Sequence, residues 1–245
     1  MGETIVKNEC YVVSLSLRVP VDNNFSAGQL KTFMNYSLFK DLESAGHQLA
    51  GVVETNGGCA AVVLAIANSG VPVAIPIANK LHAPLETIVI RRLFVRDGGA
   101  LPVCAVNVAG NLLTESESVL RSDIEKQFVA DAIESMSRRV AQMRGSVPPN
   151  DFSGSHALLV DNGIHTGSTI EIAIAAVRRL RPSRITVAIP VGDAQIKNKV
   201  ESLADAVTCL KWVENFGHTG LWYRHFNRPS DDCVKVLLER SVEWT

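Results

Sequence analysis

The chain has 245 residues, of which 47% are hydrophobic and 20% are charged, and its formal net charge is −1. This balance is typical of a soluble globular protein and excludes a largely disordered or collagen-like chain. The length allows one large domain or two small ones. Because Lys and Arg are not in excess, the composition argues against a protein whose main role is to bind nucleic acid.

Export and membrane insertion are not indicated by the sequence. Residues 1–9 contain charged side chains and no apolar run, so they do not have the pattern of a secretory signal. The uncharged stretch 55–79 is long enough for a membrane span, but Pro72, Pro76 and several Gly and Asn residues would break such a helix. The five cysteines are scattered without a CxxC pair, which favours free thiols over disulfides or a zinc site. We therefore expect a cytoplasmic protein that does not interact with membranes.

Strands and helices alternate along the predicted chain. The alternating segment 12–19 predicts a strand with one buried face, and residues 36–51 predict an amphipathic helix. Beyond these, the apolar pattern predicts strands at 60–67, 85–91, 103–108, 156–161, 184–191 and 206–210, helices ending at 81 and covering 116–144, 167–180 and 194–204, and loops at 95–102 and 145–154. Such alternation predicts an α/β fold with a mostly parallel central sheet and helices on both faces.

The segment 157–180 (ALLVDNGIHTGSTIEIAIAAVRRL) carries the most informative motif. A buried strand ends at Asp161, a short polar loop follows, and a helix begins near Ser168, which has the spacing of a capping box with Glu171. The helix N-terminus, the loop hydroxyls and Gly167 together predict a cradle for a phosphate. Asp161 could accept hydrogen bonds from sugar hydroxyls or favour a positive charge. A plain strand-to-helix turn with polar capping residues is the alternative.

At residues 160–169, VDNGIHTGST resembles the signature with which type I phosphoribosyltransferases bind phosphoribosyl pyrophosphate (PRPP). In that signature, a strand ending in two acids precedes a Thr-Gly-x-Thr loop. Further segments similar to a bacterial subgroup of these proteins are FKDLESAGHQLA (39–50), SGVPVA (69–74), LHAPLETIVIRRL (81–93), RITVAIPV (184–191) and GLWYRHFNRPSDD (220–232). The resemblance implies a phosphoribosyltransferase-like domain at 36–245, preceded by an extension at 1–35 that forms a hood or a dimer contact.

The resemblance also implies roles for individual positions. The 5-phosphate of PRPP would be bound by His165, Thr166, Gly167, Ser168 and Thr169, and the ribose hydroxyls by Asp161 and Asn162. Pyrophosphate would be bound by Asn68, Ser69 and Gly70, and a mobile loop at 92–102 would close over the reaction. Arg92 occupies a position in that loop that is usually basic, which makes Asp161, Asn162 and Arg92 the catalytic candidates. Mg²⁺ would be carried by PRPP, with no direct protein ligand expected.

Two positions depart from the pattern of the family. Asn162 replaces the second acid, and the pyrophosphate loop reads Ala-Asn-Ser-Gly at 67–70 where the subgroup carries Pro-Arg-Gly-Gly. Both changes remove charge directed at the ligand, although Arg91, Arg92 or Arg96 could substitute for the missing arginine.

The expected activity is transfer of the phosphoribosyl group, in which a nitrogen acceptor such as a nucleobase displaces pyrophosphate from ribose C1. The alternative is a non-catalytic PRPP- or nucleotide-binding regulatory protein on the same fold, which the two departures favour. We expect a homodimer, and the sequence does not identify the acceptor. Trp222, Tyr223 and Phe226 are predicted to form an apolar packing cluster, with stacking on a base as the alternative.

Overall fold

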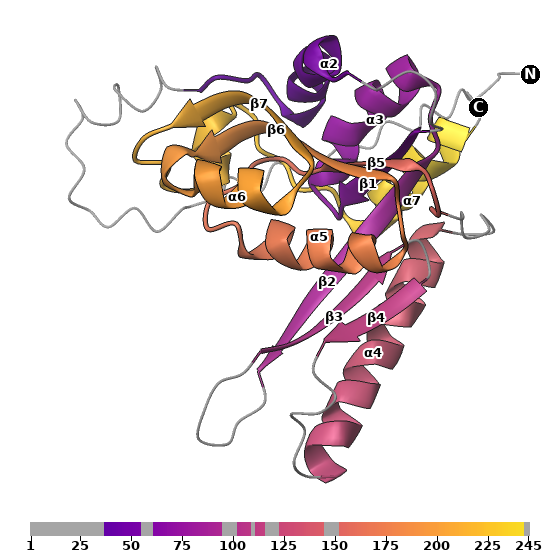
Figure 1. Ribbon diagram of the computed structural model, residues 1–245. Coiled ribbons are helices and arrows are strands. Elements are labelled where there is room, and N and C mark those ends of the chain that lie inside the picture. The colour runs from indigo at the N-terminus through magenta and orange to yellow at the C-terminus, as the bar shows by residue number, and fades with distance from the viewer. Residues whose placement is uncertain are drawn as a thin grey trace, which may run out of the picture.

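The computed structural model describes residues 37–54, 61–94, 102–108, 111–115, 123–144 and 152–242 (Figure 1). The predicted strand at 12–19 and the N-terminal extension at 1–35 lie outside the described residues, as do most of the predicted loops at 95–102 and 145–154. Those predictions are therefore not tested by the structure.

Within the described ranges, seven strands form a single sheet in the order β4-β3-β2-β1-β5-β6-β7. The strands are β1 (Ala61–Ile66), β2 (Leu85–Phe94), β3 (Pro102–Val108), β4 (Asn111–Glu115), β5 (His156–Val160), β6 (Arg184–Asp193) and β7 (Ala206–Val213). Five neighbours, β2, β1, β5, β6 and β7, run parallel, and β3 and β4 add an antiparallel edge. The predicted α/β fold with a mostly parallel sheet is confirmed.

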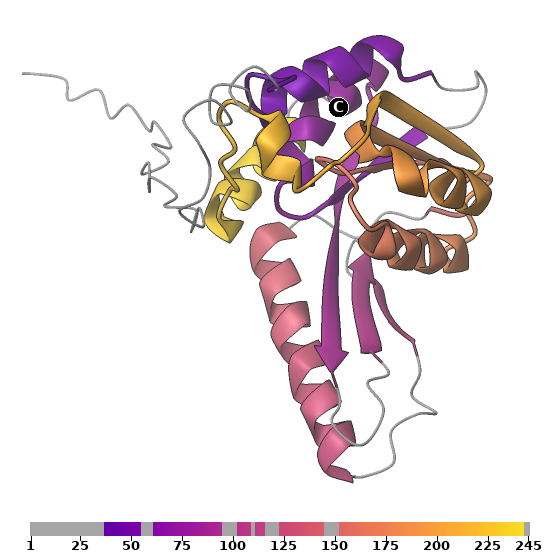
Figure 2. The ribbon, with the colours of Figure 1, turned by 90° about the vertical axis from the view of Figure 1, so that its left-hand side faces the viewer.

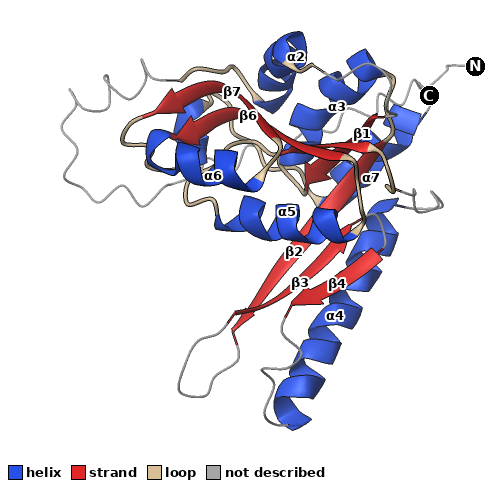
Figure 3. Cartoon of the chain, viewed as in Figure 1, coloured by secondary structure: helices blue, strands red, loops and turns tan. Residues whose placement is uncertain are grey.

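Helices cover both faces of this sheet (Figure 3). They are α2 (Leu42–Val52), α3 (Gly70–Leu81), α4 (Asp123–Arg144), α5 (Ser168–Arg179), α6 (Lys197–Leu203) and α7 (Asp231–Val242), with short 3₁₀ turns η2 (Ala194–Ile196) and η3 (Thr219–Trp222). Among the described residues, no helix has the length and apolarity needed to cross a membrane.

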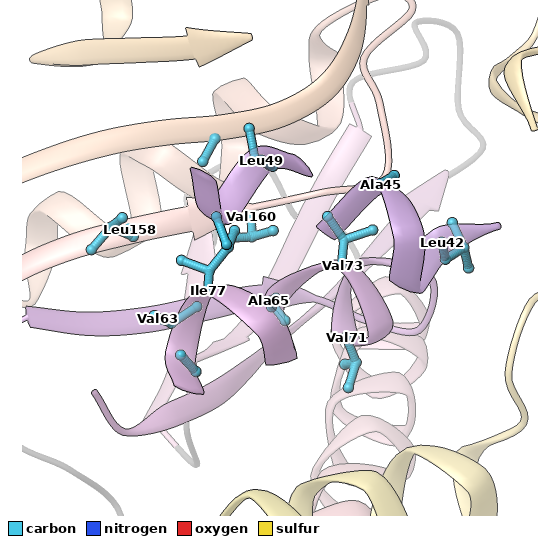
Figure 4. Close-up of a cluster of buried hydrophobic side chains, with 14 of the residues drawn as sticks. Leu42, Ala45, Leu49, Val63, Ala65, Val71, Val73, Ile77, Leu158 and Val160 are labelled. Atoms are coloured by element: carbon cyan, nitrogen blue, oxygen red, sulfur yellow. The ribbon is translucent and has the colours of Figure 1, made fainter. Parts of the chain in front are cut away.

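The central strands β1 and β5 divide the core into two halves, because successive side chains point to opposite faces. Val63 and Val160 belong to the half under α2 and α3, where Leu49 and Ile77 also pack (Figure 4). Leu64 belongs to the opposite half, under α5 and α6. Burial on both faces explains why these strands read as continuous apolar runs in the sequence.

The antiparallel strands and α4 form an arm that extends away from the α/β body (Figure 2). The carboxyl-terminal part of β2 belongs to this arm, and there Arg92 pairs with Cys104 of β3. The expectation that Arg92 begins a mobile loop is therefore wrong, because antiparallel pairing with β3 continues β2 as far as Phe94. Strand β4 is a further element of the arm that the sequence analysis did not predict.

The predicted aromatic packing cluster forms near the carboxyl end of the sheet. Trp222 and Tyr223 are buried, and the indole N–H of Trp222 donates to the carbonyl oxygen of Phe216 at 3.1 Å. The ring of Tyr223 packs against Phe39 and Phe226, with centroids 5.4 and 5.5 Å apart. These contacts join the segment after β7 to the segment before α2.

Candidate functional site

The two loops that the sequence analysis selected lie at one edge of the sheet. Strands β1 and β5 are parallel neighbours, with Ala65 paired to Val160, so their carboxyl ends point the same way. Asn68 and Ser69 follow β1, and Asp161 follows β5. A Cβ atom on Gly70 would lie 2.9 Å from the carbonyl oxygen of Val160. The absence of a side chain at Gly70 therefore lets the start of α3 lie directly against the strand end that carries Asp161.

The loop between β5 and α5 is fixed to the sheet by its backbone. Ile164 forms a bridge with Gly192 of β6. The amide of Ile164 donates to the carbonyl oxygen of Val191 at 3.1 Å, and the amide of Asp193 donates to the carbonyl oxygen of Ile164 at 2.9 Å. The side chain of Ile164 is buried beneath the loop. These backbone hydrogen bonds to β6 thus fix the position of the polar residues on either side of Ile164.

A pocket of about 210 Å³ opens above this loop. Its lining residues are Asp161, Gly163, Ile164, His165, Thr166, Gly167, Thr169, Ile170 and Thr219. Helix α5 begins at the floor of the pocket with Gly167 as its N-cap, in a left-handed conformation with φ of 76°. No side chain caps this helix, and Gly167 and Thr169 at its start line the pocket, so the positive end of the helix dipole faces the pocket.

The predicted capping box is wrong, because Gly167 takes the N-cap position and Ser168 becomes the first helical residue. The Ser168 hydroxyl lies 3.1 Å from that of Thr166, which lines the pocket. The Glu171 carboxylate pairs instead with Lys199 of α6, at 2.6 Å. The hydroxyls of Thr166 and Ser168 therefore lie beside the N-terminus of α5.

Asp161 is the acid of the pocket, and its surroundings disfavour its charge. Burial raises the pKa of Asp161 to about 7, against the lowering effects of a hydrogen bond from the Asn162 amide and of the positive charge of Arg228. That hydrogen bond measures 2.7 Å. The hydroxyl of Tyr223 donates to the carbonyl oxygen of Asn162 at 2.5 Å, which fixes the peptide between Asn162 and Gly163. Burial and the nearby Asp161 raise the pKa of Tyr223, so that its hydroxyl stays protonated as a donor.

His165 stands at the rim of the pocket. Its ring stacks on Phe216 with centroids 5.4 Å apart and an interplanar angle of 15°. Its Nε2 lies 3.9 Å from a carboxylate oxygen of Asp193, which is itself buried and accepts a hydrogen bond from the Gln195 amide. This arrangement presents an imidazole that can donate to an anion in the pocket.

The side chain of Asn68 is engaged by other parts of the protein. Its Oδ1 accepts from Nη2 of Arg139 in α4 at 2.8 Å, and its Nδ2 donates to the carbonyl oxygen of Pro229 and to Asp231 at 3.1 and 2.7 Å. Asp231 also accepts from Nε and Nη2 of Arg139 at 2.6 and 2.7 Å. Arg139 lowers the pKa of Asp231 to about 2, mainly through these hydrogen bonds. Asn68 thus fixes the loop after β1, and the sequence analysis did not find its partners Arg139 and Asp231.

Arg92 is not brought to these loops by the pairing of the strands. The β1–β2 ladder ends at Ile66 and Ile88, and Arg92 lies four positions further along β2, in the arm. Among the described residues, no group of three or more His, Cys, Asp or Glu side chains could hold a metal ion. The oxygen atoms at the site come from Asp161, Asn162 and the loop hydroxyls, and such oxygens suit Mg²⁺.

Comparison with known proteins decides the family. Residues 40–224 match the family described as Phosphoribosyl transferase domain. The chain belongs to this family. Two Mycobacterium tuberculosis proteins, from strains CDC 1551 and H37Rv, carry the name "putative phosphoribosyl transferase", and each is 33% identical to the chain over 209 residues. The match covers 83% of the chain and 47% of each relative, so the chain spans about half the length of the curated relatives it matches.

A solved structure supports the same fold for this phosphoribosyl transferase domain. The crystal structure of TT1426 from Thermus thermophilus matches with a TM-score of 0.69 and 26% sequence identity. The match covers 84% of this chain and 99% of that one. The family match at 40–224 includes both loops of the site, whereas Pro229 and Asp231 lie beyond its end.

Proposed function

We propose that the chain is a magnesium-dependent phosphoribosyltransferase that takes PRPP as donor and a nitrogen nucleophile, such as a nucleobase, as acceptor. The proposal is carried by the pocket in which the uncapped N-terminus of α5 faces the same space as Asp161. A phosphate at the helix N-terminus and a ribose beside a carboxylate require this juxtaposition. Family membership supports the reaction class.

The 5-phosphate would accept hydrogen bonds from backbone amides at the start of α5 and from the hydroxyls of Thr166, Ser168 and Thr169. Because the loop is tied to β6 through Ile164, the 5-phosphate would be held at a fixed position relative to Asp161. Asp161 and Asn162 would accept hydrogen bonds from the ribose hydroxyls. Mg²⁺, when bound through the PRPP oxygens, supplies positive charge to the departing pyrophosphate.

In the reaction, the bond between C1 and the pyrophosphate oxygen breaks and its electron pair leaves with pyrophosphate. The acceptor nitrogen forms the new bond to C1 and loses its proton to solvent. Positive charge develops at C1 in the transition state, and the ionised carboxylate of Asp161 would stabilise it. The bound cation and this developing charge both favour the ionised form of a carboxyl whose pKa is about 7 in the free protein.

The first test is calorimetric titration of PRPP into the full chain, with and without Mg²⁺. Thr166→Ala removes one hydroxyl of the loop and should weaken binding about tenfold, as expected for loss of a hydrogen bond to a charged group. Ser202→Ala is the matched control, because that exposed hydroxyl bonds to the carbonyl oxygen of Lys199 in α6. An absence of PRPP binding at millimolar ligand would refute the proposed donor.

A second candidate function is a non-catalytic protein that binds PRPP or a nucleotide as a signal. It is favoured by the missing charge at Asn162 and by the contacts that engage the Asn68 side chain. Release of pyrophosphate from PRPP in the presence of a panel of nucleobases separates the two. Binding without release over the whole panel would favour the regulatory protein.

A further inference from the structure

The pyrophosphate loop of this protein contains no cation of its own. Residues 67–70 read Ala-Asn-Ser-Gly, and the amide side chain of Asn68 is taken up by contacts with Arg139, Pro229 and Asp231. A pyrophosphate bound here would carry several negative charges, which require a positively charged partner in addition to the metal. The structure offers such a partner from another part of the chain.

The segment 223–231, here called the strap, connects the two ligand loops. At its start the Tyr223 hydroxyl bonds to the carbonyl oxygen of Asn162, after β5. At its end the Pro229 carbonyl and the Asp231 carboxylate accept from Asn68, after β1. Because β1 and β5 are neighbours, the strap crosses the sheet edge at the point where the site lies.

Arg228 lies in the strap, immediately before the residue that is hydrogen-bonded to Asn68. Its side chain is exposed, and within the described part of the chain it makes no hydrogen bond or ion pair. Because the next residue, Pro229, accepts a hydrogen bond from the Asn68 side chain, the backbone of Arg228 lies beside the loop after β1. The positive charge of Arg228 also opposes the rise that burial causes in the pKa of Asp161 and contributes to the lowered pKa of Asp231. Arg139, in contrast, has its guanidinium committed to Asp231 and Asn68.

We propose that Arg228 binds the pyrophosphate half of PRPP and replaces the cation that the loop after β1 lacks. The inference rests on the proposed function, and it assigns the pyrophosphate-binding charge to the strap. A guanidinium matches two phosphate oxygens with a pair of parallel N–H donors, a geometry that an ammonium group does not provide. Arg139 and Asp231 are positioning residues in this scheme, because they fix the end of the strap against Asn68.

The test compares two probes that divide PRPP into its halves. Ribose 5-phosphate reports the loop at 165–169, and pyrophosphate with Mg²⁺ reports the strap. Arg228→Ala should weaken binding of pyrophosphate and of PRPP about tenfold or more, and leave ribose 5-phosphate within about twofold. Arg228→Lys should recover only part of the loss, because the charge returns without the paired donors. Arg240→Ala, which removes an exposed arginine of α7, should leave all three ligands unchanged.

Thermal unfolding of each variant shows whether the fold is retained, and an exposed arginine should be replaceable without a shift in Tm. Equal affinity of wild type and Arg228→Ala for pyrophosphate would overturn the assignment while leaving the PRPP site intact. A parallel loss of ribose 5-phosphate binding in Arg228→Ala would also overturn it, because the defect would then not be specific to pyrophosphate. If the wild-type chain binds none of the three ligands, the proposed function fails and the role of Arg228 fails with it.

Discussion

The raised pKa of Asp161 makes the stability of the protein depend on pH in a defined direction. The carboxyl titrates near pH 7 in the folded chain because burial disfavours its charge, whereas its ordinary value is 3.8. Between these two values the folded chain holds a proton that the unfolded chain has released. The stability of the wild type should therefore fall as the pH rises through this window.

The size of the effect follows from the shift. Each pKa unit corresponds to about 1.4 kcal/mol, so a shift of about 3 units gives an upper limit of about 4 kcal/mol over the whole window. About 2 kcal/mol of this should be lost between pH 5 and pH 7. Asp161→Asn removes the titration but keeps an oxygen that can accept from the Asn162 amide. The stability of this variant relative to wild type should rise by about 2 kcal/mol from pH 5 to pH 7.

Urea unfolding of both chains at pH 5, 6, 7 and 8, without ligand or Mg²⁺, measures the difference directly, because all other titrating groups are common to the two proteins. Asp205→Asn is the matched control. Burial would raise the pKa of Asp205, but hydrogen bonds from Arg178 and the Ile185 amide outweigh it and lower the pKa below 3.8. The contribution of Asp205 to the free energy of unfolding is therefore already at its full value at pH 5, and it is lost only as the pH falls below 3.8. Its difference from wild type should be flat over the same range. A flat difference for Asp161→Asn, or a fall with pH, would refute the argument from burial.

Three further predictions concern packing, ligand charge and a thiol. Gly46→Ala should destabilise the fold by about 1–3 kcal/mol, because its Cβ would lie 2.5 Å from the Val73 carbonyl oxygen where α2 contacts α3. Gly51→Ala on the same helix meets nothing within 4 Å and should stabilise it by up to about 1 kcal/mol, and equal Tm shifts would contradict this contrast. Asn162→Asp should tighten Mg²⁺-dependent PRPP binding about tenfold in the same titration, since a charged acceptor replaces a neutral one, and weaker binding would count against the ribose-binding role. Burial raises the pKa of the Cys209 thiol to about 12, so iodoacetamide at pH 8 should label Cys209 only after unfolding, as mapped by peptide mass spectrometry.

The central strands could be predicted from the sequence because each is bounded by turns and consists almost entirely of buried residues. The strands β1, β5 and β6 fall within two residues of the predicted ranges for this reason. Strand β4 gives no such signal, since it has only five residues, Asn111–Glu115, and is too short for an alternating pattern to mark it. Helix α7 was missed although a signal exists: the Ser230 hydroxyl accepts from the Cys233 amide in the manner of an N-cap.

The candidate site was only partly predictable because its parts differ in sequence separation. The loop at 165–169 and Asp161 are local to one strand-to-helix connection, so a short motif contains them. The two side chains that bind Asn68, those of Arg139 and Asp231, are 71 and 163 residues away, in α4 and α7, and no periodicity relates them to Asn68. In the sequence nothing distinguishes Arg139 from other arginines near the end of a helix. Its contact with the loop after β1 exists only in the folded chain.

The backbone bridge between Ile164 and Gly192 has a thermodynamic consequence for ligand binding. Fixing a residue in one conformation costs about 1–2 kcal/mol, and a loop that orders only when ligand arrives spends binding energy on that cost. Here the conformational entropy of the loop is lost during folding, when the loop forms its hydrogen bonds to β6. The loop of the free protein therefore already has the conformation that a phosphate would meet. The binding free energy of a ligand is then not reduced by the cost of ordering this loop.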